Sequence, residues 1–205
     1  MPVRKELTVD PYEAIPYDSH AVAATHPARL ATAALLRGWE CAPPADCRML
    51  ELGCANATNL LPLAMAYPQS HFVGVERSKA QIEAARADVA ALGVRNIELI
   101  HADIVDLDDG LGRFDFIVAH GVFSWVSDAT RARILAIYAN ALADRGVGYL
   151  SYNTKPGWGL HGYLRDLWCE NAHDVAVPRE MVVRARAYLE TLLSLCSGTG
   201  RDPYC

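Results

Sequence analysis

The sequence lacks several features that define common functional classes. No apolar run approaches the roughly 18 residues of a membrane-spanning helix, and the first twenty residues hold no apolar stretch typical of a signal peptide. Positive charge is also scarce, since 19 Lys and Arg against 24 Asp and Glu give a net charge of -5. We therefore expect a cytoplasmic protein that binds neither a membrane nor nucleic acid.

The cysteines do not follow the spacing of a metal site or a disulfide framework. There are six, with no CxxC pair, and the seven histidines show no HxxxH spacing. Cys54 follows an apolar stretch and Cys196 lies on the apolar face of a predicted helix, so both are interpreted as small core side chains. The sequence predicts no metal ligand and no catalytic thiolate.

Short apolar segments alternate with helical patterns through the middle of the chain. Segments with strand character lie at 48–54, 71–76, 96–103, 114–121 and 146–154. Helical patterns lie at 25–38, 56–67, 78–93 and 127–146. Nearly continuous apolar strands that alternate with helices are typical of a parallel sheet covered on both faces. The predicted fold is therefore a doubly wound, parallel α/β sheet in which five strands are recognisable.

Several helix ends have recognisable signals. Ser78 and Gln81 form an S-x-x-Q capping box, and Gly93 and Gly146 are expected to end their helices. The first 24 residues are predicted to be irregular because prolines interrupt them. Helices are expected from about Leu160 and again from Pro178. On the last helix the apolar stripe is Met181, Val182, Ala185, Leu189, Leu192, Leu193 and Cys196.

The ends of the first two predicted strands carry a glycine and an acid. Ligands of an open parallel sheet bind at the carboxyl ends of its strands. Gly53 permits a sharp turn there, although the segment is not a G-x-G-x-x-G pattern. Glu76 stands where a carboxylate can accept hydrogen bonds from two ribose hydroxyls. The alternative is an exposed acid placed before the helix cap Ser78.

The other three strand ends are polar as well. Asp103 can accept a hydrogen bond from an exocyclic amine such as that of adenine, or it can simply form a loop. His120 follows the fourth strand. It can be a catalytic residue, or it can have a purely structural role. Tyr152, Asn153 and Thr154 follow the fifth. Polar residues at all five ends together predict a ligand site along this edge.

The segments E-L-G-C, V-G-V-E and H-A-D-I, in this order, resemble the three cofactor motifs of class I S-adenosylmethionine-dependent methyltransferases. The match is closer to a bacterial branch that carries a methyltransferase regulatory domain. It covers roughly residues 12–175 and rests on segments 25–31, 48–64, 114–126 and 148–158. That branch includes protein lysine methyltransferases that act on bacterial outer-membrane proteins.

The resemblance implies S-adenosyl-L-methionine as the cofactor and gives each site residue a role. The methionine end would contact Glu51, Gly53, Cys54, Ala55 and Asn59. The ribose would contact Glu76, and the adenine Arg77, Asp103 and Ile104. His120 and Gly121 would line the side of the methyl donor, while Tyr17 and His26 would belong to a lid. For His26, entry into the helix at Pro27 is an equal alternative.

The resemblance also implies a division of the chain and two departures from the family. The predicted parts are a lid and helix at 1–47, the cofactor-binding core at 48–155 and a helical segment at 156–205. Ala57 and Thr58 replace the usual glycines, and a positive φ at position 57 would cost about 1 kcal/mol. The resemblance implies the Rossmann-like sheet of this class, with the five strands in the order 3-2-1-4-5. The family sheet normally has seven strands, so five predict a truncated form or a fragment.

The predicted function is methyl transfer to an amine or similar nucleophile on a protein or small acceptor. His120 is the candidate base, and Tyr152 and Asn153 are candidate positioners of the acceptor. The alternative is a catalytically inactive, cofactor-binding interaction or regulatory module. The absent glycine fingerprint disfavours a nicotinamide-dependent oxidoreductase. An open fifth strand would also favour self-association of the chain through residues 147–152.

Overall fold

The computed structural model describes residues 10–198, with side chains to residue 195. The chain divides into two compact units. The sheet unit is the continuous segment 17–152, and the helical unit combines residues 1–16 and 153–205. The predicted division at 47/48 and 155/156, which concerns function, stays a prediction.

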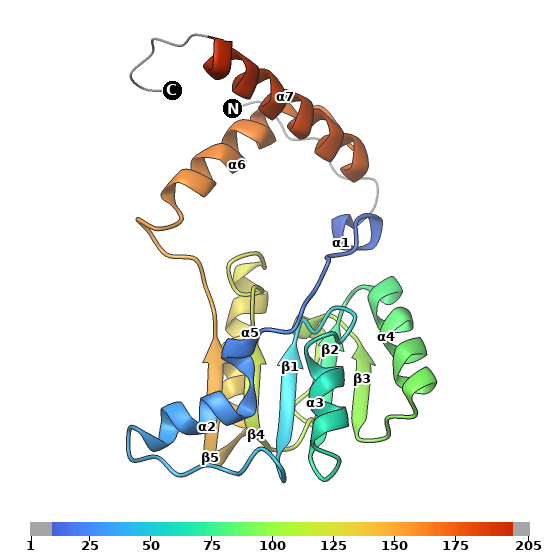
Figure 1. Cartoon of the computed structure of the whole chain (residues 1–205), viewed down its shortest axis with the longest axis vertical. Coiled ribbons are helices and arrows are strands. Elements are labelled where there is room, and N and C mark those ends of the chain that lie inside the picture. The colour runs from blue at the N-terminus through green and yellow to red at the C-terminus, as the bar shows by residue number, and fades with distance from the viewer. Residues whose placement is uncertain (1–9, 199–205) are drawn as a thin grey trace. The chain divides into compact units, whose positions relative to one another are not determined.

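The sheet unit is built on five parallel strands in the order β3-β2-β1-β4-β5 (Figure 1). This confirms the predicted fold class and strand order. The strands are β1 (Arg48–Leu52), β2 (His71–Glu76), β3 (Ile97–His101), β4 (Phe114–Ala119) and β5 (Leu142–Leu150). Because all five are parallel, their carboxyl ends meet along one edge of the sheet.

Helices cover both faces of the sheet. On one face, α2 (Pro27–Leu35), α3 (Leu60–Ala66) and α4 (Lys79–Leu92) pack around Met49 and Phe116. On the other, α5 (Asp128–Ala141) and the 3-10 turn η2 (Ile104–Asp106) pack around Leu50 and Ile117. Successive side chains of β1 and β4 thus enter different cores, which explains why these strands are apolar without alternation.

The boundaries of α4 agree with the predicted capping signals. The Ser78 hydroxyl accepts a hydrogen bond from the Gln81 backbone N–H at 3.3 Å, and Gly93 ends the helix with φ of 66°. The Gln81 side chain does not close the capping box. Its amide donates to the Tyr17 carbonyl at 3.1 Å instead. Gln81 therefore also binds Tyr17, the first residue of the sheet unit.

The predicted helix at 127–146 is too long. The structure ends α5 at Ala141 and starts β5 at Leu142, which has extended backbone, so Gly146 lies within a strand. Phe114 pairs with Leu142 while Phe116 pairs with Val147, and the extra residues between them form an irregularity in the ladder. The glycine signal is wrong here because the pairing of Leu142 with Phe114, and not the local sequence, sets the end of α5.

The first 24 residues are less irregular than predicted. The described part contains a short helix, α1 (Pro11–Ala14), and a 3-10 turn, η1 (Ala23–Thr25). The Asp10 carboxylate caps α1 by accepting from the Tyr12 N–H at 2.8 Å. Residues 1–9 lie outside the described part of the chain.

The helical unit contains the predicted C-terminal helices, α6 (Gly159–Asn171) and α7 (Pro178–Gly198). Arg179 of α7 donates to the Ala14 carbonyl of α1 at 3.1 Å. The predicted stripe on α7 is only partly covered, since Val182 and Leu193 are exposed. The side chain of Cys196 lies outside the described residues. No helix among the described residues is long and apolar enough to cross a membrane.

Candidate functional site

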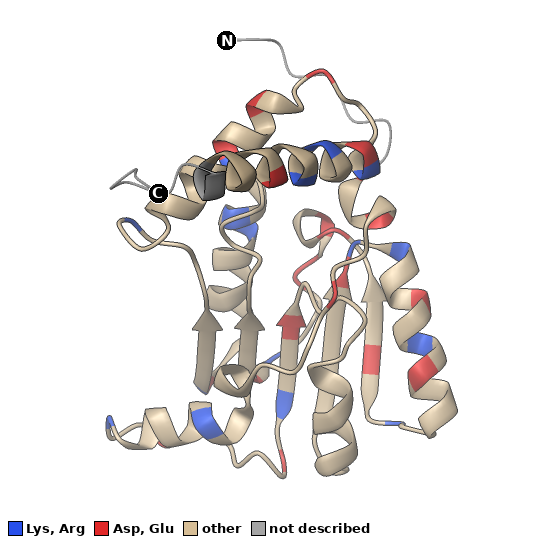
Figure 2. Cartoon of the chain, turned by 45° about the horizontal axis from the view of Figure 1, so that its top comes forward, with Lys and Arg blue, Asp and Glu red and all other residues tan. Residues whose placement is uncertain are grey.

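Two acidic side chains lie at the carboxyl ends of the neighbouring strands β1 and β2. Figure 2 shows acidic residues in red at both strand ends. Glu51 is the fourth residue of β1, and Glu76 is the last residue of β2. The loop at residues 53–59, which we call the β1–α3 loop, follows Glu51 directly. These two acids and this loop form the centre of the candidate site.

Glu51 is a buried acid with one oxygen left unpaired. Its side chain is 5% exposed, and Oε1 accepts a hydrogen bond from the Asn59 amide at 2.9 Å. Oε2 is buried and has no hydrogen-bond partner among the described residues. Burial raises the pKa of Glu51 to about 7, against the lowering effect of the Asn59 hydrogen bond. A buried, unpaired carboxylate oxygen is costly, so it favours a donor supplied by a ligand.

Asn59 holds Glu51 and is itself fully engaged. Besides its bond to Glu51, its amide nitrogen donates to the Thr25 hydroxyl at 3.0 Å. Its carbonyl oxygen accepts from the Val22 N–H at 2.9 Å. Both amide hydrogens are therefore used inside the protein. This geometry makes Asn59 a positioning residue that joins Glu51 to the segment preceding α2.

The β1–α3 loop has three residues with left-handed backbone. Gly53, Ala55 and Ala57 have φ of 76°, 50° and 59°. A Cβ on Gly53 would lie 2.5 Å from Cγ2 of Val122, so a side chain there would collide. Position 57 therefore has the positive φ that the family glycine would accommodate. An alanine in this conformation costs about 1 kcal/mol relative to glycine.

The segment at residues 17–25 is fastened to this loop by side chains that the sequence analysis missed. The Ser19 hydroxyl donates to the Asn56 side-chain oxygen and lies 3.1 Å from the Thr58 hydroxyl. Thr58, one of the two departures from the family pattern, thus has a partner of its own. Uncharged polar residues in a proline-rich stretch carry no motif, and only the fold brings them to the loop.

The two predicted lid residues differ in their surroundings. The Tyr17 side chain is exposed, and only its backbone carbonyl is bound, by Gln81. Nδ1 of His26 accepts a hydrogen bond from the Ala28 N–H at 3.1 Å, which makes His26 the N-cap of α2. The alternative interpretation of His26, a residue at the helix entry, is therefore realised.

Glu76 links the end of β2 to the β1–α3 loop. Its Oε2 accepts from the Ala55 N–H at 3.1 Å, and its Oε1 accepts from the Ser78 N–H at 2.9 Å. The second bond corresponds to the alternative of an acid beside the helix cap. Since each carboxylate oxygen has a further lone pair, both bonds leave capacity for two ligand hydroxyls.

Cys54 belongs to the core, as interpreted from the sequence. Its sulfur packs so close to Gly74 that a Cβ there would lie 2.7 Å away. Burial raises the pKa of the Cys54 thiol well above its usual range. The side chain of this loop residue therefore packs into the core as a neutral group.

The predicted adenine side lies at the end of β3. The Asp103 carboxylate accepts from the Val105 N–H at 3.2 Å, which makes Asp103 the N-cap of η2. Its other oxygen lies 3.9 Å from a guanidinium nitrogen of Arg77. Ile104, the next residue, is buried in the core beside β2. The loop-forming role of Asp103 is thus realised, and its contact with adenine stays a prediction.

The ends of β4 and β5 bring His120 close to Tyr149. Nδ1 of His120 lies 3.4 Å from the Tyr149 hydroxyl, and burial, followed by the nearby His20, lowers the pKa of His120. Gly121 has φ of 69°, and its N–H donates to the Ser151 hydroxyl at 2.8 Å. Tyr149 and Ser151 were not identified from the sequence, although both lie in or beside the predicted fifth strand.

Of the two predicted acceptor positioners, one belongs to each unit. The Tyr152 ring lies in the sheet unit, with its centroid 6.3 Å from that of Phe123. Asn153 is the first residue of the second segment of the helical unit. No three His, Cys, Asp or Glu side chains in the described part gather as a metal site would require.

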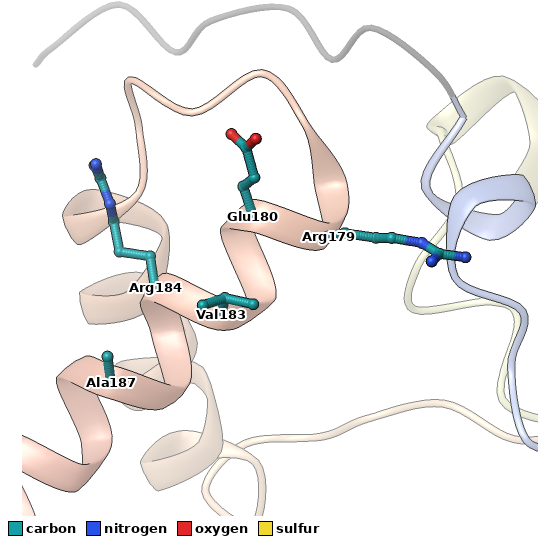
Figure 3. A pocket seen from close by; sticks show the side chains of 5 residues that line it. All are labelled: Arg179, Glu180, Val183, Arg184 and Ala187. Atoms are coloured by element: carbon teal, nitrogen blue, oxygen red, sulfur yellow. The ribbon is translucent and has the colours of Figure 1, made fainter.

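A shallow pocket on α7 is separate in character from this edge of the sheet. Arg179, Glu180, Val183, Arg184 and Ala187 line it (Figure 3). Arg184 is paired with Asp174 at 2.5 Å, and Arg179 reaches α1. No buried, unpaired polar group lines this pocket, and no strand end contributes to it. It therefore lacks the features of the candidate site at the carboxyl ends of β1 and β2.

A parallel sheet of this order, with acids at the ends of β1 and β2 and a tight loop between β1 and a helix, defines a Rossmann-like nucleotide-cofactor domain. A family model described as a methyltransferase domain matches residues 49–146. The chain therefore contains a methyltransferase domain of class I, the group whose cofactor is S-adenosylmethionine.

Two relatives and one solved structure are particularly similar. The uncharacterized protein RP789 of Rickettsia prowazekii is 41% identical over 88% of this chain and 33% of its own length. RP028 of the same organism is 36% identical over 76% of this chain and 62% of its own. The structure of PKMT2 from Rickettsia typhi in complex with AdoHcy matches with a TM-score of 0.79 and 33% identity. It aligns with 92% of this chain, which spans 36% of that protein.

Proposed function

We propose that the chain transfers the methyl group of S-adenosylmethionine to an amine or similar nucleophile on a protein or small acceptor. The observation that carries this proposal is the pair of acids at neighbouring strand ends, Glu51 with a buried unpaired oxygen and Glu76 with free acceptor capacity. The cofactor offers the matching donors, an ammonium group on its methionine end and two ribose hydroxyls.

The residues present fit this cofactor. In the proposal, Glu51 accepts from the ammonium group, and Gly53, Cys54 and Ala55 line the methionine end through their backbone. Glu76 accepts from the ribose hydroxyls. Arg77, Asp103 and Ile104 surround the adenine, and Gly121 faces the methyl donor. The AdoHcy complex of PKMT2 supports the choice of cofactor.

His120 is the proposed base. The sulfonium methyl group is already activated, so the protein mainly has to align the nucleophile and exclude water. A protonated amine must lose a proton before it can attack. The lowered pKa of His120 keeps its imidazole neutral near pH 7, the form that accepts a proton. Tyr152 and Asn153 are proposed to position the acceptor.

The identity of the acceptor is proposed from resemblance. The branch with a regulatory domain includes protein lysine methyltransferases, and the name of PKMT2 is compatible with a protein acceptor. The chain spans about a third of RP789 and of PKMT2, and we propose membership of that branch as a hypothesis. The cytoplasmic location belongs to the same proposal. The comparisons give no support to the inactive alternative.

A labelling experiment tests the proposal. The protein is incubated with a cell lysate and S-adenosylmethionine carrying an isotopically labelled methyl group, and mass spectrometry locates the label. We expect labelled amines on one or a few acceptors, and roughly 10²-fold slower labelling with His120→Ala. Tight binding of S-adenosylhomocysteine without any labelled product would contradict the proposed transfer and favour the inactive module.

We also propose that the protein associates with itself through β5. Among the described residues β5 pairs with β4 alone, and it carries no lysine or proline to discourage pairing. Side chains already donate to several carbonyls of β5: Arg113 to Leu142 at 2.6 Å, the Trp39 indole N–H to Arg145 at 3.3 Å and the Tyr138 hydroxyl to Tyr149 at 2.6 Å. Light scattering over a concentration series should show dimers or larger species. A monomer at all concentrations, with slow hydrogen exchange at residues 147–152, would show that the edge is covered.

A further inference from the structure

Glu51 is the most deeply buried acid of the candidate site, and its surroundings are unusual for a permanently charged group. One oxygen receives a single neutral amide hydrogen from Asn59, and the other receives none. No lysine, arginine or histidine is paired with it among the described ion pairs and hydrogen bonds. A carboxylate in such a place is poorly stabilised unless a cation joins it.

The groups around Glu51 offer no alternative charge compensation. On β2 and β4 its sheet neighbours are Gly74 and Val118. The titratable groups that act in this region are the Cys54 thiol and the Glu76 carboxylate. Cys54 is neutral and Glu76 is an acid, so neither supplies a positive charge. Burial raises the pKa of Glu51 to about 7, so the protonated form is well populated at neutral pH.

We propose that Glu51 binds the cofactor through a proton exchange: it gives up a proton to solvent as it accepts the ammonium group of the methionine moiety. The balance is simple. The neutral carboxyl loses H⁺ to the buffer, and the resulting carboxylate forms an ion pair with the unchanged ammonium group. This inference rests on the proposed function, because it assigns the unpaired Oε2 to the cofactor.

Asn59 and Thr25 act as positioning residues in this exchange. Asn59 holds Oε1, and the Thr25 hydroxyl, itself fully buried and donating to the Val22 carbonyl at 2.9 Å, holds Asn59. This chain fixes the direction of Oε2 while its protonation changes. It also links the proton exchange to the segment that precedes α2. The link consists of hydrogen bonds between uncharged groups and involves no charged group of that segment.

Calorimetric titration with S-adenosylhomocysteine, which carries the same ammonium group, tests the proposal without an acceptor. Binding enthalpies measured in two buffers of different ionisation enthalpy give the number of protons released. With a pKa of about 7, we expect release of about 0.9 proton at pH 6.0 and about 0.25 at pH 7.5. The dissociation constant should be about eightfold higher at pH 6.0 than at pH 7.5.

Two controls isolate Glu51. Methylthioadenosine has the same nucleoside but no ammonium group, so its binding to the unchanged protein should release no proton. Glu51→Gln, which keeps the shape of the side chain, should bind S-adenosylhomocysteine more weakly and without proton release. Circular dichroism checks that this variant is folded.

The possible outcomes separate this inference from the proposed function. S-adenosylhomocysteine binding with no proton release at pH 6.0 would overturn the inference and leave the cofactor assignment intact. Equal proton release with methylthioadenosine, or with Glu51→Gln, would place the exchange at another group and also overturn it. Failure of S-adenosylhomocysteine to bind at all would overturn the proposed function together with this inference.

Discussion

The sheet unit and the helical unit place their apolar residues in very different surroundings. In the sheet unit, large side chains such as Phe72, Phe114 and Phe116 are completely buried. In the described part of the helical unit only Ala172 and Pro178 are buried, while Leu160, Val183 and Leu193 are exposed. The difference arises because a sheet offers two faces for helices to cover, whereas α6 and α7 have chiefly each other.

The comparison teaches that an amphipathic pattern predicts a helix better than it predicts burial. The stripe on α7 is as regular as that of α4, yet the inner residues of α4, Ile82 and Ala85, are fully buried and Leu193 is not. Burial depends on the partner surface, which the local sequence does not encode. Stability and the candidate site should therefore both depend on the sheet unit, and matched substitutions in the two units test this.

The largest expected effect is on stability. Leu50→Ala removes a completely buried side chain from β1 and should lower the free energy of unfolding by about 2–5 kcal/mol. Leu193→Ala, the same substitution on an exposed site of α7, should change it by no more than about 0.5 kcal/mol. Denaturant titrations measure both. Equal losses would show that α7 buries Leu193 in solution.

The next effect is on turnover. His120→Ala should lower the methyl-transfer rate roughly 10²-fold or more, with little change in the affinity for S-adenosylhomocysteine. Because the lowered pKa lies below 6.5, the neutral base is lost only on acidification, so activity should fall as pH drops through a value under 6.5. His173→Ala in the helical unit is the control and should keep the rate.

A parallel loss of binding and turnover in His120→Ala would give His120 a different role, that of a residue lining the cofactor pocket. An acidic limb that persists unchanged in the variant would assign the titration to another group. Either result would move the proposed base away from the end of β4.

A smaller effect is expected at the ribose position. Glu76→Ala should weaken the binding of S-adenosylhomocysteine by about 1–3 kcal/mol, because two ligand hydroxyls and the Ala55 N–H lose their acceptor. Glu180→Ala, an acid of α7, should leave the affinity unchanged. Calorimetry measures both variants. Unchanged affinity in Glu76→Ala would remove the ribose assignment.

The fold could be predicted further than the site. The cap at Ser78 and the glycine end at Gly93 depend on local patterns, and the strand order was implied by the family resemblance; the structure has all of them as expected. The end of α5 could not be predicted, because it is set by pairing of Leu142 with Phe114, residues distant in sequence.

For the site, the sequence identified the residues at the strand ends but not the links between them. Glu76 is visible as an acid at the end of an apolar strand, whereas Glu51 lies within the first strand and was identified through the family resemblance. The unpaired Oε2 of Glu51 and the hydrogen bond from Asn59 to Thr25 arise only in the folded chain, where segments 34 positions apart meet. Such contacts depend on tertiary structure, so a single sequence carries no direct signal for them.

The smallest expected effect compares two alanines. Ala187→Gly, in the interior of α7, should reduce helix stability by about 0.5–1 kcal/mol, since glycine gains backbone freedom in the unfolded chain. At Ala57 the same substitution relieves a left-handed φ of 59° but removes a buried methyl group. These opposing effects should nearly cancel, leaving the free energy of unfolding within about 0.5 kcal/mol. Denaturant titration measures the free energy of unfolding of Ala57→Gly. Circular dichroism measures the loss of helicity in Ala187→Gly. A loss at Ala57 above about 1 kcal/mol would mean that packing against the loop outweighs the backbone strain there.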